Sequence, residues 1–311
     1  MRTVMIVGGL GYLGGRIALA CANSGWNVWL ATRATQDLPI ELQHARIRLI
    51  APGTESVALQ SVSAVIMLAA ANELTVDIEL ACRDTTLSCA RWLQWAAGAD
   101  PKKFIYVSTA HVYGTPQGLA FTEATPPRPR HSYADTHLAA EVLVQGAHRR
   151  GHVDGLIFRL SNAFGAPAHP GVARWSLLLS DLAKQAASSS HMQLASDGRP
   201  ERNFITLSDV CAAMLWALAR EYAGEEAPIF NLCSEHSVSV LSMAQRLAGR
   251  FARVGDAPII TCAALNSKTA TPFLLRSGLP AQGFVLSNEI DAELDGLVTF
   301  CRLHFHRQTS S

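Results

Sequence analysis

Residues 3–15, TVMIVGGLGYLGG, decide how the rest of the sequence is interpreted. The run begins with five mainly apolar residues that predict a buried strand, and residues 13–24 follow with the pattern of a helix. Between the two, Gly8 permits a tight turn, Gly11 lets the backbone approach a pyrophosphate, and Gly14 allows close packing of helix on strand. The phosphates would then lie at the helix N-terminus.

Strand-like and helix-like segments continue to alternate after this motif. Apolar runs predict strands at residues 27–31, 62–70, 103–108, 153–160 and 229–233. Apolar residues at helical spacing predict helices at residues 77–97, 132–149, 174–187, 208–220 and 240–251, with Ser132 as the cap of the second. Strands that are apolar on both faces and alternate with helices indicate a parallel sheet covered by helices.

The length of 311 residues exceeds what a single core usually supports, so we expect a large domain and a smaller one. We expect a dinucleotide-binding domain at residues 1–165, with 203–233 returning to it. Residues 166–202 and 234–311 then form the second, substrate-binding domain. No linker-like segment separates them.

The composition, 49% hydrophobic and 16% charged, predicts a folded chain with a large core. A net charge of +1 gives no electrostatic reason to expect nucleic acid or an anionic membrane as partner. No apolar stretch reaches the roughly 20 residues of a membrane span, and the N-terminal run lacks a signal-peptide pattern. Seven scattered cysteines without C-x-x-C spacing favour reduced thiols in a cytoplasmic protein over disulfides or a metal site.

The end of the second predicted strand bears on the cofactor. An acidic residue there would bind the ribose hydroxyls of NAD, but the sequence has Thr32 and Arg33. Arg33 can pair with a 2′-phosphate and stack on adenine, which favours NADP. The alternative is a solvated surface arginine and less selective binding of NAD.

Three later motifs carry a resemblance to a known family. They are YVSTAHVYG at 106–114, YADTH at 133–137 and RLSNAFG at 159–165. With LAA at 68–70 and DGRPERNF at 197–204, they resemble the extended short-chain dehydrogenase/reductases, and among these the NAD-dependent epimerase/dehydratases of nucleotide sugars. The resemblance covers nearly the whole chain. It implies an α/β fold with a Rossmann doubly wound parallel sheet and a smaller, interwoven C-terminal substrate domain.

The resemblance also implies residue roles. Tyr133 is expected to be the acid/base that exchanges a proton with a substrate hydroxyl or ketone, and Thr109 to hold the same oxygen. A phenol, with a free pKa near 10, can supply the proton that a ketone needs as it accepts hydride. Asn162 and Arg202 are expected to grip the nucleotide diphosphate, although Arg202 could instead close the domains through a salt bridge. The expected cofactor contacts are Gly8, Gly11, Tyr12, Leu13, Gly14, Thr32, Arg33, Leu68, Ala69, Ala70, Val107, Tyr133 and His137.

The sequence departs from the family pattern at the lysine four residues after the tyrosine, which is His137 here. The spacing keeps it on the same helix face as Tyr133. A histidine, mostly neutral at pH 7, can still bind ribose but lowers the phenol pKa less than lysine does. A slow enzyme or an inactive binder are therefore alternatives to a fully active enzyme.

A second departure follows Thr109, where dehydratases of the family place Asp-Glu and this chain has Ala110 and His111. This argues against 4,6-dehydration. His111 is either a second acid/base for epimerisation or an ordinary loop histidine. Further departures are Asn203 beside Arg202, Cys82 where asparagine is common, and Ala-Pro-Gly at 51–53.

The sequence thus predicts an NADP- or NAD-dependent reductase or epimerase of a nucleotide-activated keto sugar. An NAD-retaining nucleotide-sugar 4-epimerase and a weakly active or inactive dinucleotide-binding regulator remain alternatives. The resemblance further implies a homodimer, because helices 77–97 and 132–149 occupy the positions that relatives pair into a four-helix bundle. Trp92 and Trp95 would face the partner or, alternatively, pack on the sheet.

Overall fold

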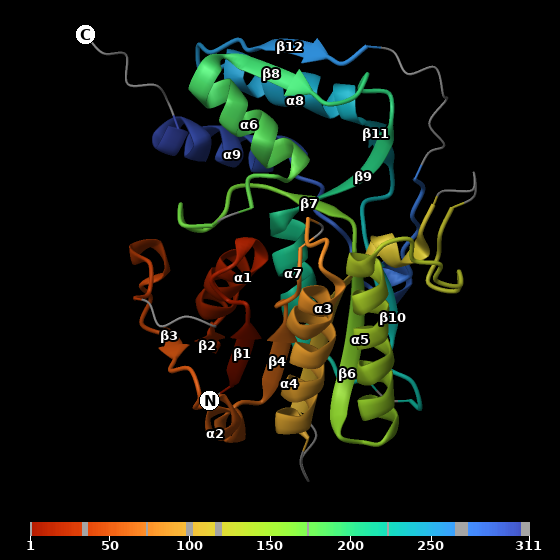
Figure 1. Cartoon of the computed structure of the whole chain (residues 1–311). Helices are drawn as coiled ribbons and strands as arrows, with labels where there is room; N and C mark the ends of the chain where they lie inside the picture. The colour runs from red at the N-terminus through yellow and green to blue at the C-terminus, as the bar shows by residue number, and fades with distance from the viewer. Residues whose placement is uncertain are drawn as a thin grey trace.

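The computed structural model describes residues 2–32, 37–72, 74–97, 102–115, 120–172, 174–222, 224–264 and 273–305. Within these ranges seven parallel strands form one sheet, in the order β10-β6-β5-β4-β1-β2-β3 (Figure 1). The chain builds outward from β1 to β3 and then crosses to β4 on the other side of β1. This reversal is that of a Rossmann doubly wound sheet, so the predicted fold class is confirmed. The strands are β1 (Thr3–Val7), β2 (Asn27–Ala31), β3 (Ile47–Ile50), β4 (Ala64–Met67), β5 (Lys102–Thr109), β6 (Val153–Leu160) and β10 (Ile229–Leu232).

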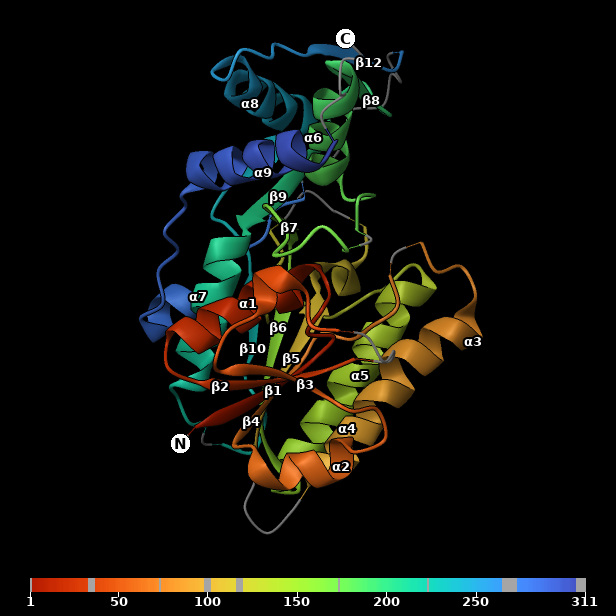
Figure 2. The same ribbon diagram turned by 90° about the vertical axis from the view of Figure 1, so that its left-hand side faces the viewer.

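Helices cover both faces of the sheet, as Figure 2 shows. On one face lie α1 (Tyr12–Asn23) and α7 (Leu207–Leu218); on the other lie α3 (Ile78–Ala81), η3 (Cys82–Leu87), α4 (Ser88–Ala96) and α5 (Ser132–Arg149). Alternate residues of β1 supply both cores, because Val4 and Ile6 pack with α1 and α7 while Met5 and Val7 pack with α4 and α5. Short helical turns complete this unit at α2 (Glu55–Ala58), η1 (Ile40–Leu42), η2 (Leu59–Ser61) and η4 (Ala110–Tyr113).

The helix predicted at 77–97 is interrupted by the π-helical segment η3. Thr85, fully buried in this segment, accepts a hydrogen bond from the backbone N–H of Ala71 at 2.9 Å and so ties the helix to the loop after β4. At α5 the predicted cap Ser132 is wrong. It is the first helical residue, and the Nδ1 atom of His131 caps the helix by accepting from the N–H of Ala134 at 3.3 Å.

A smaller unit sits above the carboxyl ends of the strands (Figure 1). Three helices pack around its core, and five short strands flank them. These elements are α6 (Leu178–Ser189), α8 (Val240–Ala252), α9 (Ile290–Phe305), β7 (Asn162–Phe164), β8 (His191–Leu194), β9 (Glu201–Thr206), β11 (Ser237–Ser239) and β12 (Ile259–Cys262). Leu279 of η5 (Leu279–Gln282) and Phe284, although in the range assigned to the substrate domain, pack into the core of the large sheet. The boundaries between the two domains stay a prediction.

Two further observations concern the chain as a whole. All seven cysteines lie in the described ranges and are free thiols. Of the helices in those ranges, none has the length and apolar character needed to cross a membrane.

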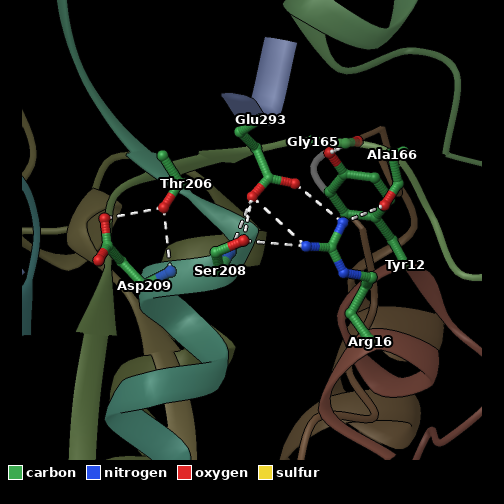
Figure 3. Close-up of polar contacts among 8 residues, drawn as sticks. All are labelled: Tyr12, Arg16, Gly165, Ala166, Thr206, Ser208, Asp209 and Glu293. Atoms are coloured by element: carbon green, nitrogen blue, oxygen red, sulfur yellow. Dashed lines mark hydrogen bonds and ion pairs between the residues drawn. The ribbon is translucent and has the colours of Figure 1, made fainter. Parts of the chain in front are cut away.

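A buried carboxylate joins the two units (Figure 3). Glu293, at the start of α9, accepts hydrogen bonds from Arg16 of α1 at 2.8 Å and from the backbone N–H of Ser208 of α7 at 3.0 Å. Arg16 also donates to the carbonyl oxygen of Ala166 at 2.8 Å, and the Tyr12 hydroxyl donates to that of Gly165 at 2.9 Å. The helix that follows the glycine-rich loop is therefore fixed directly to the C-terminal unit.

The segment before α9 is held by a second carboxylate, that of Asp209. The backbone N–H groups of Ser287 and Asn288 donate to it, at 2.7 and 3.2 Å. The Thr206 hydroxyl donates to Asp209 at 2.8 Å and accepts from its N–H at 2.9 Å, which caps α7 (Figure 3). The Ser208 hydroxyl also donates to Glu293, so two side chains in one turn of α7, Ser208 and Asp209, position α9.

We predict that Arg16→Met lowers the free energy of unfolding by about 3 kcal/mol, because it leaves the Glu293 carboxylate, whose side chain is 3% exposed, without its counter-charge. The matched control is Arg246→Met. The Arg246–Asp291 pair also involves α9, but its side chains are 44% and 48% exposed, so its loss should cost less than about 1 kcal/mol. Urea unfolding measures both. Equal losses in the two variants would contradict a special role for the buried pair.

Candidate active site

One large cavity, about 1390 Å³ in volume, opens at the carboxyl ends of β1, β4, β5 and β6. Every predicted site residue that the structure describes lies in its wall. Arg33 lies outside the described residues. The set comprises Gly8, Gly11, Tyr12, Leu13, Gly14, Thr32, Leu68, Ala69, Ala70, Val107, Thr109, His111, Tyr133, His137, Asn162 and Arg202. Parallel strands end at one edge, which is why motifs far apart in sequence meet here.

The glycine-rich loop forms one end of the cavity. Gly8 has a φ of +83° that few other residues adopt, and its carbonyl accepts the N–H of Gly11 at 2.9 Å. A Cβ atom on Gly14 would lie 2.3 Å from that same carbonyl oxygen, so only glycine lets α1 approach this closely. Gly11 caps α1 without a side-chain hydrogen bond, and the first turn holds no acid. The free N–H groups of this turn suit a pyrophosphate.

The cavity wall at the ends of β2 and β4 is formed by small or apolar, uncharged side chains. Thr32 follows β2, and Leu68, Ala69 and Ala70 follow β4. Glu55 also lines the cavity and was not predicted as a site residue.

The centre of the cavity holds Thr109 and Tyr133. Thr109 ends β5 and is 4% exposed, and its hydroxyl accepts the N–H of His111 at 3.2 Å. Three histidine rings surround that of Tyr133, with centroids at 4.7 Å for His137, 5.9 Å for His131 and 6.1 Å for His111. His131 was missed as a site residue. The H-x-Y-x-x-x-H spacing at 131–137 is the signal that could have found it.

His137 is buried, with 3% of its surface exposed. Its Nδ1 atom lies 2.8 Å from the hydroxyl of Tyr106 on β5. Burial and, to a smaller extent, the nearby His111 together lower the pKa of His137 to about 3, so the ring is neutral at pH 7. Its Nε2 atom is buried and has no hydrogen-bond partner in the part of the chain described.

A buried ion pair supports the segment from Ser108 to Tyr113. Arg159 of β6 donates to the Glu141 carboxylate of α5 at 2.7 Å, and the Ser108 hydroxyl donates to the same carboxylate. Arg159 also donates to the Tyr113 hydroxyl at 3.1 Å, which in turn donates to Asn231 at 2.7 Å. The motif at 159–165 therefore holds the residues on both sides of Thr109 in place. Its partner Glu141, an acid on the buried face of a predicted helix, was not anticipated.

Asn162 and Arg202 line the side of the cavity that faces the C-terminal unit. Asn162 donates to the carbonyl of Asn203 at 2.8 Å. Arg202, exposed on β9, forms no ion pair with the residues that the structure describes, so no domain-closing salt bridge is seen among them. Asn203 is fully buried and exchanges hydrogen bonds with the backbone of Ser234 at 2.9 and 3.0 Å, which makes it a structural residue. Arg174 also lines this side and was missed.

Comparisons with known proteins agree with this geometry. The chain is 33% identical over 151 residues to dTDP-D-glucose 4,6-dehydratase of Mus musculus, which covers 48% of this chain and 40% of that enzyme. It is 31% identical over 139 residues to dTDP-6-deoxy-L-talose 4-dehydrogenase (NAD(P)(+)) of Kitasatospora kifunensis, which covers 44% and 42%. The chain spans between 39% and 52% of the length of these and similar curated relatives.

A solved structure similar in fold is that of UDP-glucuronic acid 4-epimerase from Bacillus cereus in complex with NAD. The TM-score is 0.82 at 19% identity, and all of both chains is covered. A family model described as the NAD dependent epimerase/dehydratase family matches residues 4–233. This range contains the glycine-rich loop, Thr109, Tyr133 and Asn162, and the resemblance inferred from their motifs is confirmed: the chain belongs to the NAD dependent epimerase/dehydratase family.

Proposed function

We propose that the protein is an NADP- or NAD-dependent reductase or epimerase of a nucleotide-activated keto sugar, with Tyr133 as its acid/base. The observation that carries this proposal is the single cavity that runs from the glycine-rich loop past Thr109 and Tyr133 to Arg202. Its two ends suit the two phosphate-bearing molecules that such a reaction requires, a dinucleotide and a nucleotide diphosphate sugar.

The residues at the first end fit a nicotinamide dinucleotide. The N-terminus of α1, whose N-cap Gly11 supplies no side-chain hydrogen bond, would hold the pyrophosphate. His137 would hydrogen-bond the nicotinamide ribose. The bound cofactor would supply or accept the hydride.

Tyr133 and Thr109 would handle the oxygen of the reacting carbon. During reduction the carbon gains hydride, the C=O electron pair moves to oxygen, and the Tyr133 hydroxyl gives that oxygen a proton. The Thr109 hydroxyl would donate a hydrogen bond to the same oxygen and favour the charge that develops there. In the reverse direction the Tyr133 phenolate would take the proton back.

Arg202 would bind the diphosphate of the substrate, because a guanidinium contacts phosphate oxygens in pairs. Asn162 would add a contact beside it. Ala110 is buried and apolar, and His111 carries no carboxylate, so the acids that drive water elimination are missing next to Thr109. This favours reduction or epimerisation over 4,6-dehydration.

Two alternatives use the same cavity. A nucleotide-sugar 4-epimerase that retains NAD would oxidise and reduce one carbon through the same Tyr133. A weakly active or inactive dinucleotide-binding regulator is favoured by the neutrality of His137, which removes the cation found in the family at this position.

The first test requires a substrate, which a thermal-shift screen of nucleotide sugars with NAD or NADP would identify. We expect Tyr133→Phe to lower the rate of reduction by about 10²–10⁴-fold, since it removes the proton donor. Tyr222→Phe is the control, because that hydroxyl donates to the Ala217 carbonyl outside the cavity wall. An unchanged rate in Tyr133→Phe would end the acid/base assignment and favour the regulator.

The oxidative direction should depend on pH, because it needs the Tyr133 phenolate and the neutral His137 supplies no charge to favour it. Wild-type oxidation should therefore improve as the pH rises. His137→Lys places a cation beside the phenol and should move the optimum to lower pH. Rates are measured across pH in both directions, with the melting temperature as a check of folding. An optimum unmoved in a folded His137→Lys protein would show that the charge at this position does not control the proton transfer.

The cofactor preference rests on two opposing charges. We expect NADP to bind more tightly than NAD because of Arg33, and the selectivity to fall in Arg33→Ala. Glu55→Gln should instead strengthen NADP binding alone, since it removes a negative charge from the cavity wall. Calorimetry measures both cofactors, with the exposed Arg253→Ala as the control. Equal affinities in the wild type would refute the preference for NADP.

We propose that the protein is a homodimer and that the surface formed by η3, α4 and α5 is its interface. Trp92 is 6% exposed and packs on the sheet, and the ring of Trp95 lies edge-on to it with a centroid distance of 5.3 Å. The large apolar side chains that this surface exposes are therefore not the tryptophans but Leu87, at 59%, and Val142, at 64%. We expect light scattering to give twice the chain mass of 33.4 kDa. The double variant Leu87→Asp/Val142→Asp should halve this mass. Leu303→Asp, at a still more exposed position on α9, should leave it unchanged. A wild-type mass of one chain at micromolar concentration would exclude the dimer.

A further inference from the structure

The Tyr106–His137 contact has no part in the chemistry proposed above. Tyr106 lies in the middle of β5, with 1% of its surface exposed, and its hydroxyl meets the Nδ1 atom of His137 at 2.8 Å. The contact joins the sheet to α5, across 31 residues of sequence. His137 lines the cavity, whereas Tyr106 does not.

Both groups are neutral at pH 7. Burial raises the pKa of Tyr106 well above its usual value, and the nearby Cys89, Glu141 and Tyr133 add to this effect. Burial and His111 lower the pKa of His137. Tyr106 therefore keeps its proton, and the imidazole carries one proton, on either Nδ1 or Nε2.

The two placements of that proton differ in how many buried polar groups they leave without a partner. With the proton on Nδ1, the ring donates to the Tyr106 oxygen. The Tyr106 O–H then has no acceptor among the described residues, and Nε2 is left as a second unpaired atom. With the proton on Nε2, Tyr106 donates to Nδ1 and only the Nε2–H is unpaired. Because an unpaired buried polar group is destabilising, the placement that leaves fewer of them is favoured.

We propose that Tyr106 is a positioning residue that holds His137 in its Nε2–H form, so that the imidazole presents a neutral hydrogen-bond donor to the ribose diol of the dinucleotide. The inference rests on the proposed function, because it takes the cofactor as the acceptor. Among the described residues the Nε2–H of this pair has no hydrogen-bond acceptor, and a ribose hydroxyl can serve as that acceptor. The Tyr106–His137 pair would thus offer the ribose a hydrogen-bond donor, as the family's lysine ammonium group does, but without a positive charge.

The ring proton can be observed directly in the unliganded protein. Nitrogen-15 NMR of histidine-labelled protein distinguishes a protonated ring nitrogen from an unprotonated one, and the His137→Gln spectrum assigns the signals. We expect wild-type His137 to show a protonated Nε2 and an unprotonated Nδ1. In Tyr106→Phe that preference should weaken, whereas Tyr222→Phe, which removes a hydroxyl outside the cavity wall, should leave it unchanged.

Calorimetry supplies the second readout. Tyr106→Phe should weaken binding of NAD and NADP about two- to tenfold, the range that one neutral hydrogen bond gives. The same loss should appear for a dinucleotide and for a fragment that retains the nicotinamide ribose, but not for adenosine diphosphate, which lacks that ribose. Tyr222→Phe should bind all of them as the wild type does.

Two results would overturn the inference. One is a protonated Nδ1 of His137 in the wild type. The other is that Tyr106→Phe changes neither the tautomer of His137 nor the affinity for the dinucleotide. A weaker binding of adenosine diphosphate in the same variant would indicate a general disturbance of the site and would also overturn it. If the wild type binds no dinucleotide, the proposed function fails and the ribose contact fails with it. The NMR result would still decide whether Tyr106 sets the tautomer.

Discussion

The close approach of α1 to the turn after β1 is the constraint on which the rest of the molecule depends. It exists because Gly14 carries no side chain where a Cβ would lie 2.3 Å from the Gly8 carbonyl oxygen. The helix that starts there aims its free N–H groups into the cavity. One turn later the same helix presents Arg16 to Glu293 of the C-terminal unit. The short distance between α1 and the turn after β1 therefore fixes two things. It fixes the anion site at the helix N-terminus and, through Arg16, the position of the C-terminal unit.

The parts of the fold that could be predicted are those governed by local pattern. The strand at 153–160 and the helix at 132–149 were predicted with their observed limits, because each is long and strongly apolar or periodic. The short strands β8, β9, β11 and β12 were not, since three to six residues carry little pattern and their pairing depends on distant partners. Helix α9 was also missed, although Leu294, Leu297, Val298 and Cys301 have helical spacing and are buried.

The candidate site was predictable to the extent that motifs sit at strand ends. Thr109 and Asn162 meet because parallel strands end at one edge, so order along the chain was enough to place them together. Tyr106 and Glu141 could not be found in this way. Their roles come from the packing of α5 on the sheet, which brings each to a partner in another element. Glu55 and His131 likewise enter the cavity from loops and helix ends whose course the sequence does not specify.

The π-helical segment η3 has a consequence for the phase of the helix that contains it. The buried residues Ala81, Thr85 and Cys89 recur every four positions, whereas an α-helix turns once in about 3.6 residues, or about 100° per residue. In a regular helix each would lie about 40° further around the axis than the last, and Trp92 would rotate away from the sheet with them. The wider π-helical turn removes this excess rotation, so Thr85 can hold the loop after β4 while Trp92 stays on the core. Removing one residue between 82 and 87 would restore a uniform helix but rotate either the loop anchor or the tryptophan out of register.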